Sequence, residues 1–369
     1  MSLASGFAGR KQADGTTGLQ VTVVTPTSCG AFDDASLPFR VVRRPSPAQL
    51  LNLVRAADLV HVSGPAFLPM LFGLLLGKPI VVEHSTYQAI CPNGLLLDER
   101  TKTVCPGHFG EGRYGECWRC NSASVGRRKS MAMLLLSFPR RWMSGRVARN
   151  VVPTAHEGKR VALPRTVTIY HGVPLPPALP PPEAQILQSP VSFAYVGRLV
   201  SEKGLHLLVD SARRLLEAKC NFRLKFIGDG PERARLEREV DTSGLRTRVV
   251  FTGYLRGEEL EKVLGDVGVV VMPSIWEETA GLAAMEHMMR GRMVIAADIG
   301  GLGELVDGTS LKFPAGDIDA LACCMKRVID DPGLARALGQ KARQRAEQLF
   351  VMERMVAEHF ELYRSLLGG

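Results

Sequence analysis

The sequence predicts an α/β fold with two doubly wound domains that face each other across a cleft. The chain has 369 residues, more than one hydrophobic core usually serves. Short apolar runs alternate with amphipathic helical stretches in both halves, which is typical of parallel sheets built from βαβ units. Residues 174–190 contain seven prolines, which suit a semi-rigid linker better than a helix or a central strand.

Short apolar runs mark the expected strands. In the first half they are residues 19–24, 59–62, 79–82, 150–153 and 166–169, and in the second half 192–196, 223–227, 249–252, 267–272 and 293–296. The expected helices of the second half are 204–218, 232–242, 257–263, 282–289, 317–329 and 333–348, followed by a last one through Leu367. These elements predict Rossmann-like domains at 1–177 and 191–350, a linker at 178–190, and a helical segment at 351–369 that packs back toward the first domain. In open sheets of this kind ligands bind beyond the carboxyl ends of the strands, so we expect an enzyme with its site in the cleft.

Composition is that of a soluble globular protein. Apolar residues make up 46% and charged residues 22% of the chain, which excludes disorder, collagen and a coiled coil. No apolar run reaches the roughly 18 to 20 residues that a membrane span needs, and the first residues lack the apolar core of a secretory signal. We therefore expect a cytoplasmic protein.

The positive charge is concentrated in the first half. Residues 1–182 contain 21 Lys and Arg against 10 Asp and Glu, whereas residues 183–369 contain 25 against 27. Residues 127–149 hold seven cations and no acid, interleaved with apolar side chains such as Met131, Leu135 and Trp142. This segment has two readings: a surface that meets lipid headgroups or an acidic acceptor, which would place the protein at the inner face of the membrane, or a solvated helix face.

Most of the candidate ligand-binding residues of the second half cluster at residues 273–291. A strand is followed by a loop with Glu278, then Gly281 opens a helix that carries Glu286. The unpaired backbone N–H groups at a helix start favour an anion, and glycine allows a phosphate to approach the main chain closely. Carboxylates on either side of that helix start suit the hydroxyl pairs of a ribose or hexose.

Further phosphate-binding features lie upstream. Gly197, Arg198 and Lys203 directly follow a strand, and two cations in such a loop suit a diphosphate. The segments FIGDGPE at 226–232 and FTGY at 251–254 add glycine turns at two more strand ends.

Taken in order, these motifs resemble the family-4 retaining glycosyltransferases of the GT-B fold. The matching pieces are GRLVSEKG, IGDGPE, VFTGY, the Glu-x7-Glu element at 278–286 and IAADIGGLGELV at 295–306, which cover the second domain almost completely. The resemblance implies that 191–350 binds a nucleotide diphosphate sugar and that 1–177 binds the acceptor. It departs from the family at Ala280, where phenylalanine is usual, and at His171, where asparagine is usual.

The resemblance also implies roles for individual residues. Glu278 and His84 would act at the reaction centre. The donor would be held by Arg198 and Lys203 at the phosphates, by backbone N–H groups of Gly281 and Leu282, by Glu286 at the ribose, and by Tyr254 and Leu255 beside the base. Transfer would retain the anomeric configuration without a catalytic metal. Front-face attack by the acceptor is favoured over a covalent sugar intermediate on Glu278.

Four of the eight cysteines lie within residues 91–120. Cys91, Cys105, Cys117 and Cys120 include one Cys-x2-Cys pair, and four thiolates satisfy tetrahedral zinc. The two readings are a structural zinc site and a metal-free, cysteine-bearing acceptor loop.

The start of the chain departs from the resembled family. Family members open with an apolar strand and a Gly-Gly loop, and residues 1–18 offer neither, so we expect a first domain without its first strand. The two readings are a start codon assigned too late and a truncated domain that is catalytically impaired.

The sequence therefore predicts a hexosyltransferase that uses a nucleotide sugar and a polysaccharide, lipid-linked or other cell-envelope acceptor. The alternatives are a non-catalytic protein of the same fold, a sugar-nucleotide epimerase, and a zinc-dependent nucleic-acid binder. The ordered donor-site motifs argue against the last, and no nucleic-acid partner is expected.

Overall fold

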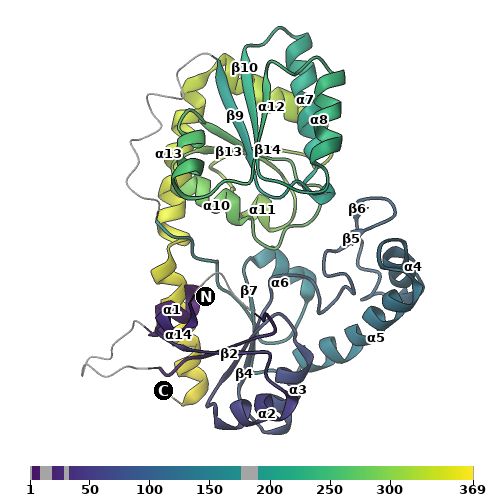
Figure 1. Cartoon of the computed structure of the whole chain (residues 1–369), viewed down its shortest axis with the longest axis vertical. Helices are drawn as coiled ribbons and strands as arrows, with labels where there is room; N and C mark the ends of the chain where they lie inside the picture. The colour runs from purple at the N-terminus through teal and green to yellow at the C-terminus, as the bar shows by residue number, and fades with distance from the viewer. Residues whose placement is uncertain (1, 9–18, 29–32, 176–189, 369) are drawn as a thin grey trace.

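The computed structural model describes residues 2–8, 19–28, 33–175 and 190–368. Two α/β domains follow each other along the long axis of the molecule, and the C-terminal helix returns from the second domain to the first (Figure 1). The predicted α/β class, with parallel sheets in both domains, is confirmed. The exact domain boundaries stay a prediction, and most of the expected linker, residues 178–190, lies outside the described residues.

The second domain is built on one six-stranded parallel sheet with the order β11-β10-β9-β12-β13-β14. Its strands are β9 (Val191–Val196), β10 (Phe222–Ile227), β11 (Val249–Gly253), β12 (Val269–Met272), β13 (Met293–Ala297) and β14 (Leu311–Phe313). Chain order runs outward from β9 on one side and outward from β12 on the other. The strand order therefore reverses between β9 and β12, which are paired at Phe193 and Val269.

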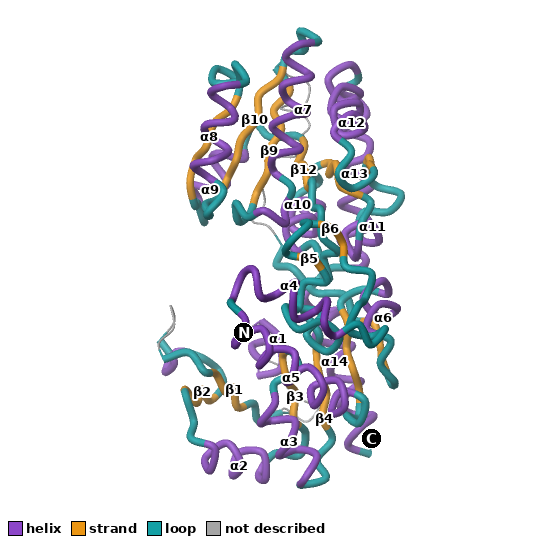
Figure 2. The backbone as a smooth tube through the Cα atoms, turned by 90° about the vertical axis from the view of Figure 1, so that its right-hand side faces the viewer, coloured by secondary structure: helices purple, strands orange, loops and turns teal. Residues whose placement is uncertain are grey.

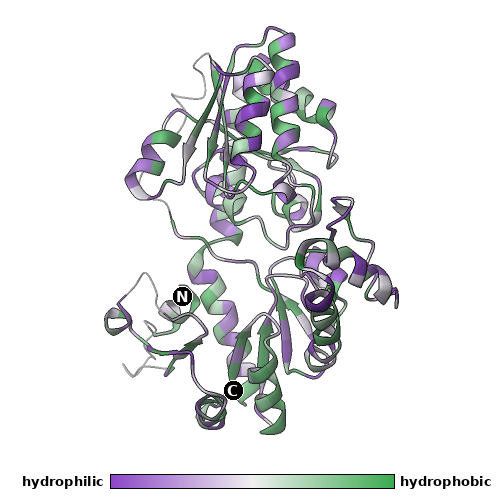
Figure 3. Ribbon diagram, turned by 45° about the vertical axis from the view of Figure 1, so that its right-hand side comes forward, coloured by the Kyte–Doolittle hydropathy of each residue, from purple (hydrophilic) through white to green (hydrophobic). Residues whose placement is uncertain are grey.

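Helices cover both faces of this sheet. They are α7 (Leu205–Glu217), α8 (Arg233–Thr242), α9 (Gly257–Leu264), α10 (Leu282–Met289), α11 (Gly300–Leu305), α12 (Ile318–Asp330) and α13 (Pro332–Leu349). Alternate residues of β9 enter different cores, because Phe193 and Tyr195 pack with α7 and α12 while Ala194 packs with α10 and α13. Both faces are thus buried at the centre of the sheet, where β12 and β13 read as continuous apolar runs. Figure 3 shows the hydrophobic colour on much of the sheet, whereas the helices carry both colours.

The first domain contains a four-stranded parallel sheet with the order β3-β4-β7-β8. Its strands are β3 (Val60–Ser63), β4 (Ile80–Glu83), β7 (Arg149–Val152) and β8 (Thr166–Thr168), and its helices are α2 (Pro47–Ala56), α3 (Phe67–Leu75), α4 (Tyr114–Val125), α5 (Arg127–Ser144) and α6 (Ala155–Val161). A short hairpin of β5 (Leu97–Asp98) and β6 (Thr103–Val104) lies in the cysteine-rich insert.

The start of the chain is arranged differently from the rest of this domain. Strands β1 (Thr22–Thr25) and β2 (Arg40–Arg43) pair in parallel as a sheet of their own, and Figure 2 shows them apart from β3 and β4. Residues Ser2–Ala8 form a short helix, α1, whose Phe7 packs on Tyr363 with ring centroids 5.2 Å apart. The absence of a first central strand stays a prediction, since residues 9–18 lie outside the described part.

Helix α14 (Met352–Leu367) belongs by its contacts to the first domain. Its Met355, Val356 and Tyr363 pack against Val81 and Val151 of the central strands. Where the chain enters this helix, Val173 N–H donates to the carbonyl of Phe350 at 2.8 Å, and Val173 forms a parallel bridge with Val351. None of the described helices is long and apolar enough to span a membrane.

Candidate active site

The candidate site lies at the point where the strand order of the second sheet reverses. Parallel strands end at one edge, so the loops that follow the neighbouring strands β9 and β12 meet there. The first loop carries Gly197, Arg198 and Lys203, and the second carries Glu278 before α10. The backbone joins the loops directly, because Ile275 N–H donates to Glu202 O at 3.1 Å.

Glu278 is held on three sides and is only 3% exposed. Its Oε1 accepts a hydrogen bond from the Ser274 hydroxyl and lies 2.9 Å from Lys203 Nζ. Its carbonyl accepts a hydrogen bond of 2.7 Å from Gly301 N–H. Ser274 and Lys203 therefore fix the orientation of the carboxylate, and Gly301 of α11 fixes the backbone of the same residue.

The β9 loop depends on close backbone packing. Gly228, which follows β10, has φ +139° and lies so close to the Gly197 carbonyl that a side chain would collide with it. Tyr195 OH donates to Arg198 O at 2.8 Å and fixes the turn. The Arg198 side chain is exposed at the sheet edge, while Lys203 is turned inward and lies 5.6 Å from the Trp276 ring centroid. The two predicted phosphate ligands thus come from one loop, but the Arg198 side chain is exposed to solvent and the Lys203 side chain is largely buried.

The start of α10 offers backbone N–H groups without a side-chain cap. Gly281 is the N-cap residue, and no side chain in the described part of the chain caps the first turn. A Cβ on Gly281 would lie 2.9 Å from Leu302 Cδ1, so glycine permits α11 to pack against this turn. Leu282 is 49% exposed. The N-terminal N–H groups of a helix favour an anion, and in this turn Leu282 N–H donates to Ala280 O at 3.1 Å.

Two further predicted donor residues, Glu286 and Tyr254, lie on α10 and directly after β11. Burial raises the pKa of the Glu286 carboxyl, which Arg290 partly opposes. Arg290 itself is paired with Glu261 at 2.7 Å. Tyr254 is 73% exposed after β11, and Leu255 packs at the edge of the core. No hydrogen bond or ion pair between described residues joins Glu286 to Glu278.

His84 follows β4 and is completely buried. Its Nε2 lies 2.9 Å from Asn150 Oδ1. Both hydrogens of the Asn150 amide are used by the carbonyls of Ser144 and Pro164, so Oδ1 must accept and His84 Nε2 must carry the proton. Burial lowers the pKa of His84, which favours the neutral ring, and Nδ1 has no hydrogen-bond partner among the described residues.

The two domains are in direct contact beside Glu278. Thr154 Oγ1 donates to Thr279 O at 2.9 Å, and Thr279 Oγ1 donates to Ser85 O at 3.0 Å. The start of α6 and the loop after His84 therefore both contact the loop between β12 and α10, which we call the donor-side loop. Arg160 Nε donates to Glu277 Oε2 at 2.8 Å, and its Nη2 donates to Cys105 O at 2.8 Å. Burial raises the pKa of Glu277, but His156 and Arg160 outweigh this and leave it below its usual value.

Glu304 makes a second contact between the domains. Its carboxylate accepts from the backbone N–H groups of Ala155 and His156, at 3.0 and 2.7 Å, and from Tyr170 OH at 2.8 Å. A carboxylate from the second domain therefore caps the N-terminus of α6 in the first, where the helix dipole favours negative charge.

Sequence reasoning did not identify Ser274, Arg160, Thr154 or Glu304 as site residues. Glu304 lies in the quoted segment 295–306, so its carboxylate beside a glycine pair was a usable signal. The other three depend on contacts between distant parts of the chain and had no local signal.

His171, one of the departures from the resembled family, lies in a partly buried cluster of the first domain. Its Nδ1 is 3.6 Å from Glu83 Oε1, and His61 Nε2 is 3.1 Å from Glu83 Oε2. Burial raises the pKa of Glu83, but His61, His359 and His171 outweigh this and lower it to about 2. His61 also contacts Tyr363 of α14, so this cluster helps to attach α14 to the sheet.

The four cysteines of the insert are buried free thiols. Cys91 Sγ donates to Asn93 Oδ1, while Glu99 N–H and Gly107 N–H donate to the sulfurs of Cys120 and Cys105. Burial raises the pKa of Cys117 to about 12 and that of Cys120 to about 11, so both are protonated at neutral pH. Among the described residues no group of three His, Cys, Asp or Glu is arranged to hold a metal ion. Zinc binding by these thiols stays a prediction.

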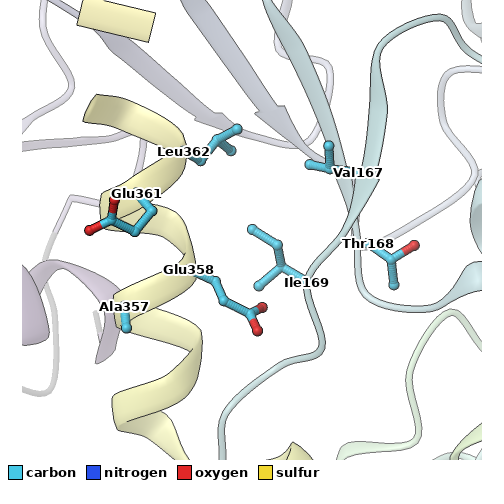
Figure 4. Close-up of a pocket in the computed structure, with 7 residues that line it drawn as sticks. All are labelled: Val167, Thr168, Ile169, Ala357, Glu358, Glu361 and Leu362. Atoms are coloured by element: carbon cyan, nitrogen blue, oxygen red, sulfur yellow. The ribbon is translucent and has the colours of Figure 1, made fainter. Parts of the chain in front are cut away.

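A cavity of about 400 Å³ lies between β8 and α14 (Figure 4). It is lined by Val167, Thr168, Ile169, Ala357, Glu358, Glu361 and Leu362. None of the predicted donor or catalytic residues lines it, so it is separate from the candidate site.

Comparison with known proteins bears on the second domain and on the fold. Residues 182–345 match the family model described as glycosyl transferases group 1. The chain is 35% identical over 178 residues to 2-deoxystreptamine glucosyltransferase from Streptomyces kanamyceticus, a match that covers 48% of this chain and 46% of that protein. The match thus spans about half the length of that relative.

Two solved structures share the fold along most of the chain. Sucrose-phosphate synthase from Thermosynechococcus elongatus aligns with a TM-score of 0.70 at 23% identity, covering 99% of this chain and 91% of that one. Anabaena Alr3699/HepE in complex with UDP-glucose aligns with a TM-score of 0.64 at 17% identity, covering 89% and 86%. At these identities the likeness concerns the fold alone.

Proposed function

We propose that the whole chain transfers a hexose from a nucleotide diphosphate sugar to a glycan or lipid-linked acceptor of the cell envelope, with retention of the anomeric configuration. The match of residues 182–345 to the family model described as glycosyl transferases group 1 supports this. The observation that carries the proposal is the buried Glu278, held by Lys203 and Ser274 beside the uncapped start of α10. This places a fixed carboxylate next to a cation and a set of backbone N–H groups. Such a combination suits a sugar joined to a diphosphate.

The donor would lie across the edge where β9 and β12 end. Lys203, Arg198 and the N–H groups of Gly281 and Leu282 would bind the diphosphate, which needs positive charge as it departs. Glu286 would accept hydrogen bonds from the ribose, and Tyr254 with Leu255 would border the base. The structure with UDP-glucose among the proteins of the same fold supports this class of donor.

Transfer would proceed on one face of the sugar. The bond between the anomeric carbon and the diphosphate oxygen breaks, the acceptor oxygen bonds to that carbon from the same side, and the acceptor proton passes to the departing diphosphate. Glu278 Oε1 already accepts two hydrogen bonds, from Ser274 and Lys203. Hydrogen bonds to a carboxylate reduce its nucleophilicity, so Glu278 would stabilise the developing positive charge of the sugar rather than form a covalent intermediate.

His84 would contact the donor sugar or the acceptor at the reaction centre. Its ring is neutral and fixed by Asn150, and its loop is joined to the donor side through Ser85 and Thr279. A neutral imidazole with an available Nδ1 acceptor suits a sugar hydroxyl better than a phosphate.

A thermal-shift screen tests the donor assignment. Nucleoside diphosphates and their sugars are added to the wild type and to Glu286→Ala, with Glu353→Ala on the exposed face of α14 as the control. We expect at least one nucleotide to raise Tm in the wild type and the control. The same nucleotide should bind Glu286→Ala at least about tenfold more weakly, and so raise its Tm less at the same concentration. If no nucleotide stabilises the wild type, the donor-site proposal fails. Turnover of the sugar without any acceptor would indicate an epimerase instead.

A further inference from the structure

Helix α5 carries two different faces. Ser130, Leu134, Ser137 and Ser144 are buried against the first domain. Met131, Leu135, Phe138 and Trp142 lie on another face, at intervals of four, three and four residues, which aligns them along the helix. Their exposed fractions are 43, 60, 40 and 54%.

This exposed stripe, which we term the α5 stripe, continues onto α4. The ring centroids of Phe138 and Tyr114 are 4.9 Å apart, and Tyr114 is itself 40% exposed. Figure 1 shows α4 and α5 side by side along one flank of the first domain. Single exposed apolar residues are ordinary, but an aligned series that includes an aromatic pair and a tryptophan is typical of a binding surface.

Cations border the α5 stripe at both ends. Arg127, Arg128 and Lys129 form the first turn, where the helix dipole disfavours positive charge. Arg140, Arg141 and Arg146 lie near the other end, and the Arg146 guanidinium lies 3.9 Å from the Trp142 ring centroid. Residues 127–149 contain no acid, and no ion pair between described residues involves any of these cations. The first domain itself therefore does not explain three consecutive cations at this helix start.

We propose that the α5 stripe and its bordering cations dock the first domain on an anionic lipid bilayer. The four apolar side chains would enter the boundary between headgroups and acyl chains, and the cations would pair with lipid phosphates. Trp142 with the adjacent guanidinium suits that boundary, where one end of the side chain is apolar and the other is hydrated. A bilayer uses both features of this surface, whereas a nucleic acid would leave the apolar series uncovered.

Docking there would present the first domain to an acceptor that is itself lipid-linked, so the inference rests on the proposed function for its biological role. The binding step requires neither donor nor transfer. Vesicle binding and glycosyl transfer can therefore be measured separately on the same protein.

Co-sedimentation of the full chain with vesicles tests the proposal. One set of vesicles contains phosphatidylcholine alone, and the other contains equal parts of phosphatidylcholine and phosphatidylglycerol. We expect binding to the anionic vesicles that weakens as salt is added, because the headgroup interaction is screened. Each cation near such a surface contributes about fivefold in affinity, so Arg127→Gln, Arg128→Gln and Lys129→Gln together are expected to weaken binding about a hundredfold.

A second variant tests the apolar contribution. Leu135→Ser combined with Trp142→Ser is expected to weaken binding by at least about tenfold at any salt concentration. Lys341→Gln on α13 and Val250→Ser on β11, both exposed in the second domain, are the matched controls and are expected to bind like the wild type. Circular dichroism melts verify that every variant is folded.

Several results would overturn the proposal. They are equal binding to both kinds of vesicle, no binding to either, and anionic binding that the α5 variants retain. Conversion of a dimer to a monomer by the serine variant, with vesicle binding unchanged, would identify the α5 stripe as a contact between copies and would also overturn it. Loss of transfer with vesicle binding intact would count against the proposed function alone.

Discussion

Arg160 of α6 donates a 2.8 Å hydrogen bond to Glu277, the residue that precedes Glu278 in the donor-side loop. Glu278 itself binds Lys203, within the second domain. Of these two consecutive carboxylates, Glu277 binds the first domain and Glu278 binds the second. Both domains therefore fix the loop between β12 and α10. Because Arg160 also binds the carbonyl of Cys105, the cysteine-rich insert is attached to the same loop.

Arg160→Met is expected to destabilise the protein by about 2 kcal/mol, since it leaves Glu277 largely buried with only His156 nearby. The value lies below that for a fully buried pair because the Arg160 side chain is 26% exposed. Urea unfolding measures the change. Arg119→Met, which removes a pair with Glu116 from a side chain that is 62% exposed, is the control and is expected to change stability by less than about 1 kcal/mol. Equal effects in the two variants would contradict a structural role for the Arg160–Glu277 contact.

Glu278→Gln is expected to lower kcat by roughly a hundredfold to a thousandfold while the donor KM changes little, because the charge would act mainly on the transition state. Lys203→Met, by contrast, is expected to raise the donor KM, since that ammonium would bind the diphosphate before and during the reaction. Steady-state kinetics with varied donor concentration separates the two patterns. A Glu278→Gln enzyme with normal kcat would remove this residue from the reaction centre.

Gly301→Ala is expected to weaken the contact between the domains by about 1–3 kcal/mol. A Cβ at this position would collide with the Thr279 carbonyl and lie 2.8 Å from Thr154 Oγ1. Gly115→Ala in α4 is the matched control, because nothing lies within 4 Å of its Cβ position and alanine favours a helix. Thermal unfolding of the two variants gives the comparison, and a Gly301→Ala protein as stable as Gly115→Ala would show that the domains do not need this close approach.

Glu157→Gln is expected to flatten the dependence of stability on pH. Both carboxyl oxygens of Glu157 are buried without a hydrogen-bond partner among the described residues, and burial raises its pKa from 4.5 to about 9. A raised carboxyl pKa means that the unfolded chain loses its proton first, so stability is fully present below about pH 4.5 and declines as pH rises toward 9. At pH 7 the loss is about 3 kcal/mol.

Unfolding by urea between pH 5 and pH 9 tests this. The wild type should lose stability as pH rises, while Glu157→Gln should lose less and become the more stable protein near pH 8. Glu353→Gln, at an exposed position on α14, should follow the wild type. Parallel curves for all three proteins would mean that Glu157 is already ionised in the folded state.

Much of the second domain could be predicted because each of its helices and strands has a recognisable pattern in its own stretch of sequence. The expected helix at 282–289 matches α10, and each expected strand overlaps an observed one, because every one of these strands contains several apolar residues that pack into the domain core. Two strands were not predicted. Strand β2 (Arg40–Arg43) of the first domain has only two valines between arginines, and β14 of the second domain has only three residues with Lys312 in the middle.

The site was predictable as a list of residues but not as a set of contacts. The glycine turns and the paired glutamates are visible in the sequence, yet Lys203 and Glu278 are 75 positions apart, and His84 and Asn150 are 66 apart. Only the strand order brings such groups together. The contacts of Arg160 and Glu304 also depend on how the two domains pack, which no local pattern encodes.

The bridge between Val173 and Val351 has a consequence for how such proteins can be recombined. The chain passes between the domains twice, and this bridge joins the two passages. The second domain is therefore an internal cassette, and α14, although last in sequence, belongs with Val81 and Val151 of the first domain. A chimaera that exchanges only the segment between the two passages keeps every helix on its own sheet. A chimaera that exchanges everything after the first passage gives the first domain a foreign α14. Phe7 then loses its ring contact with the native Tyr363.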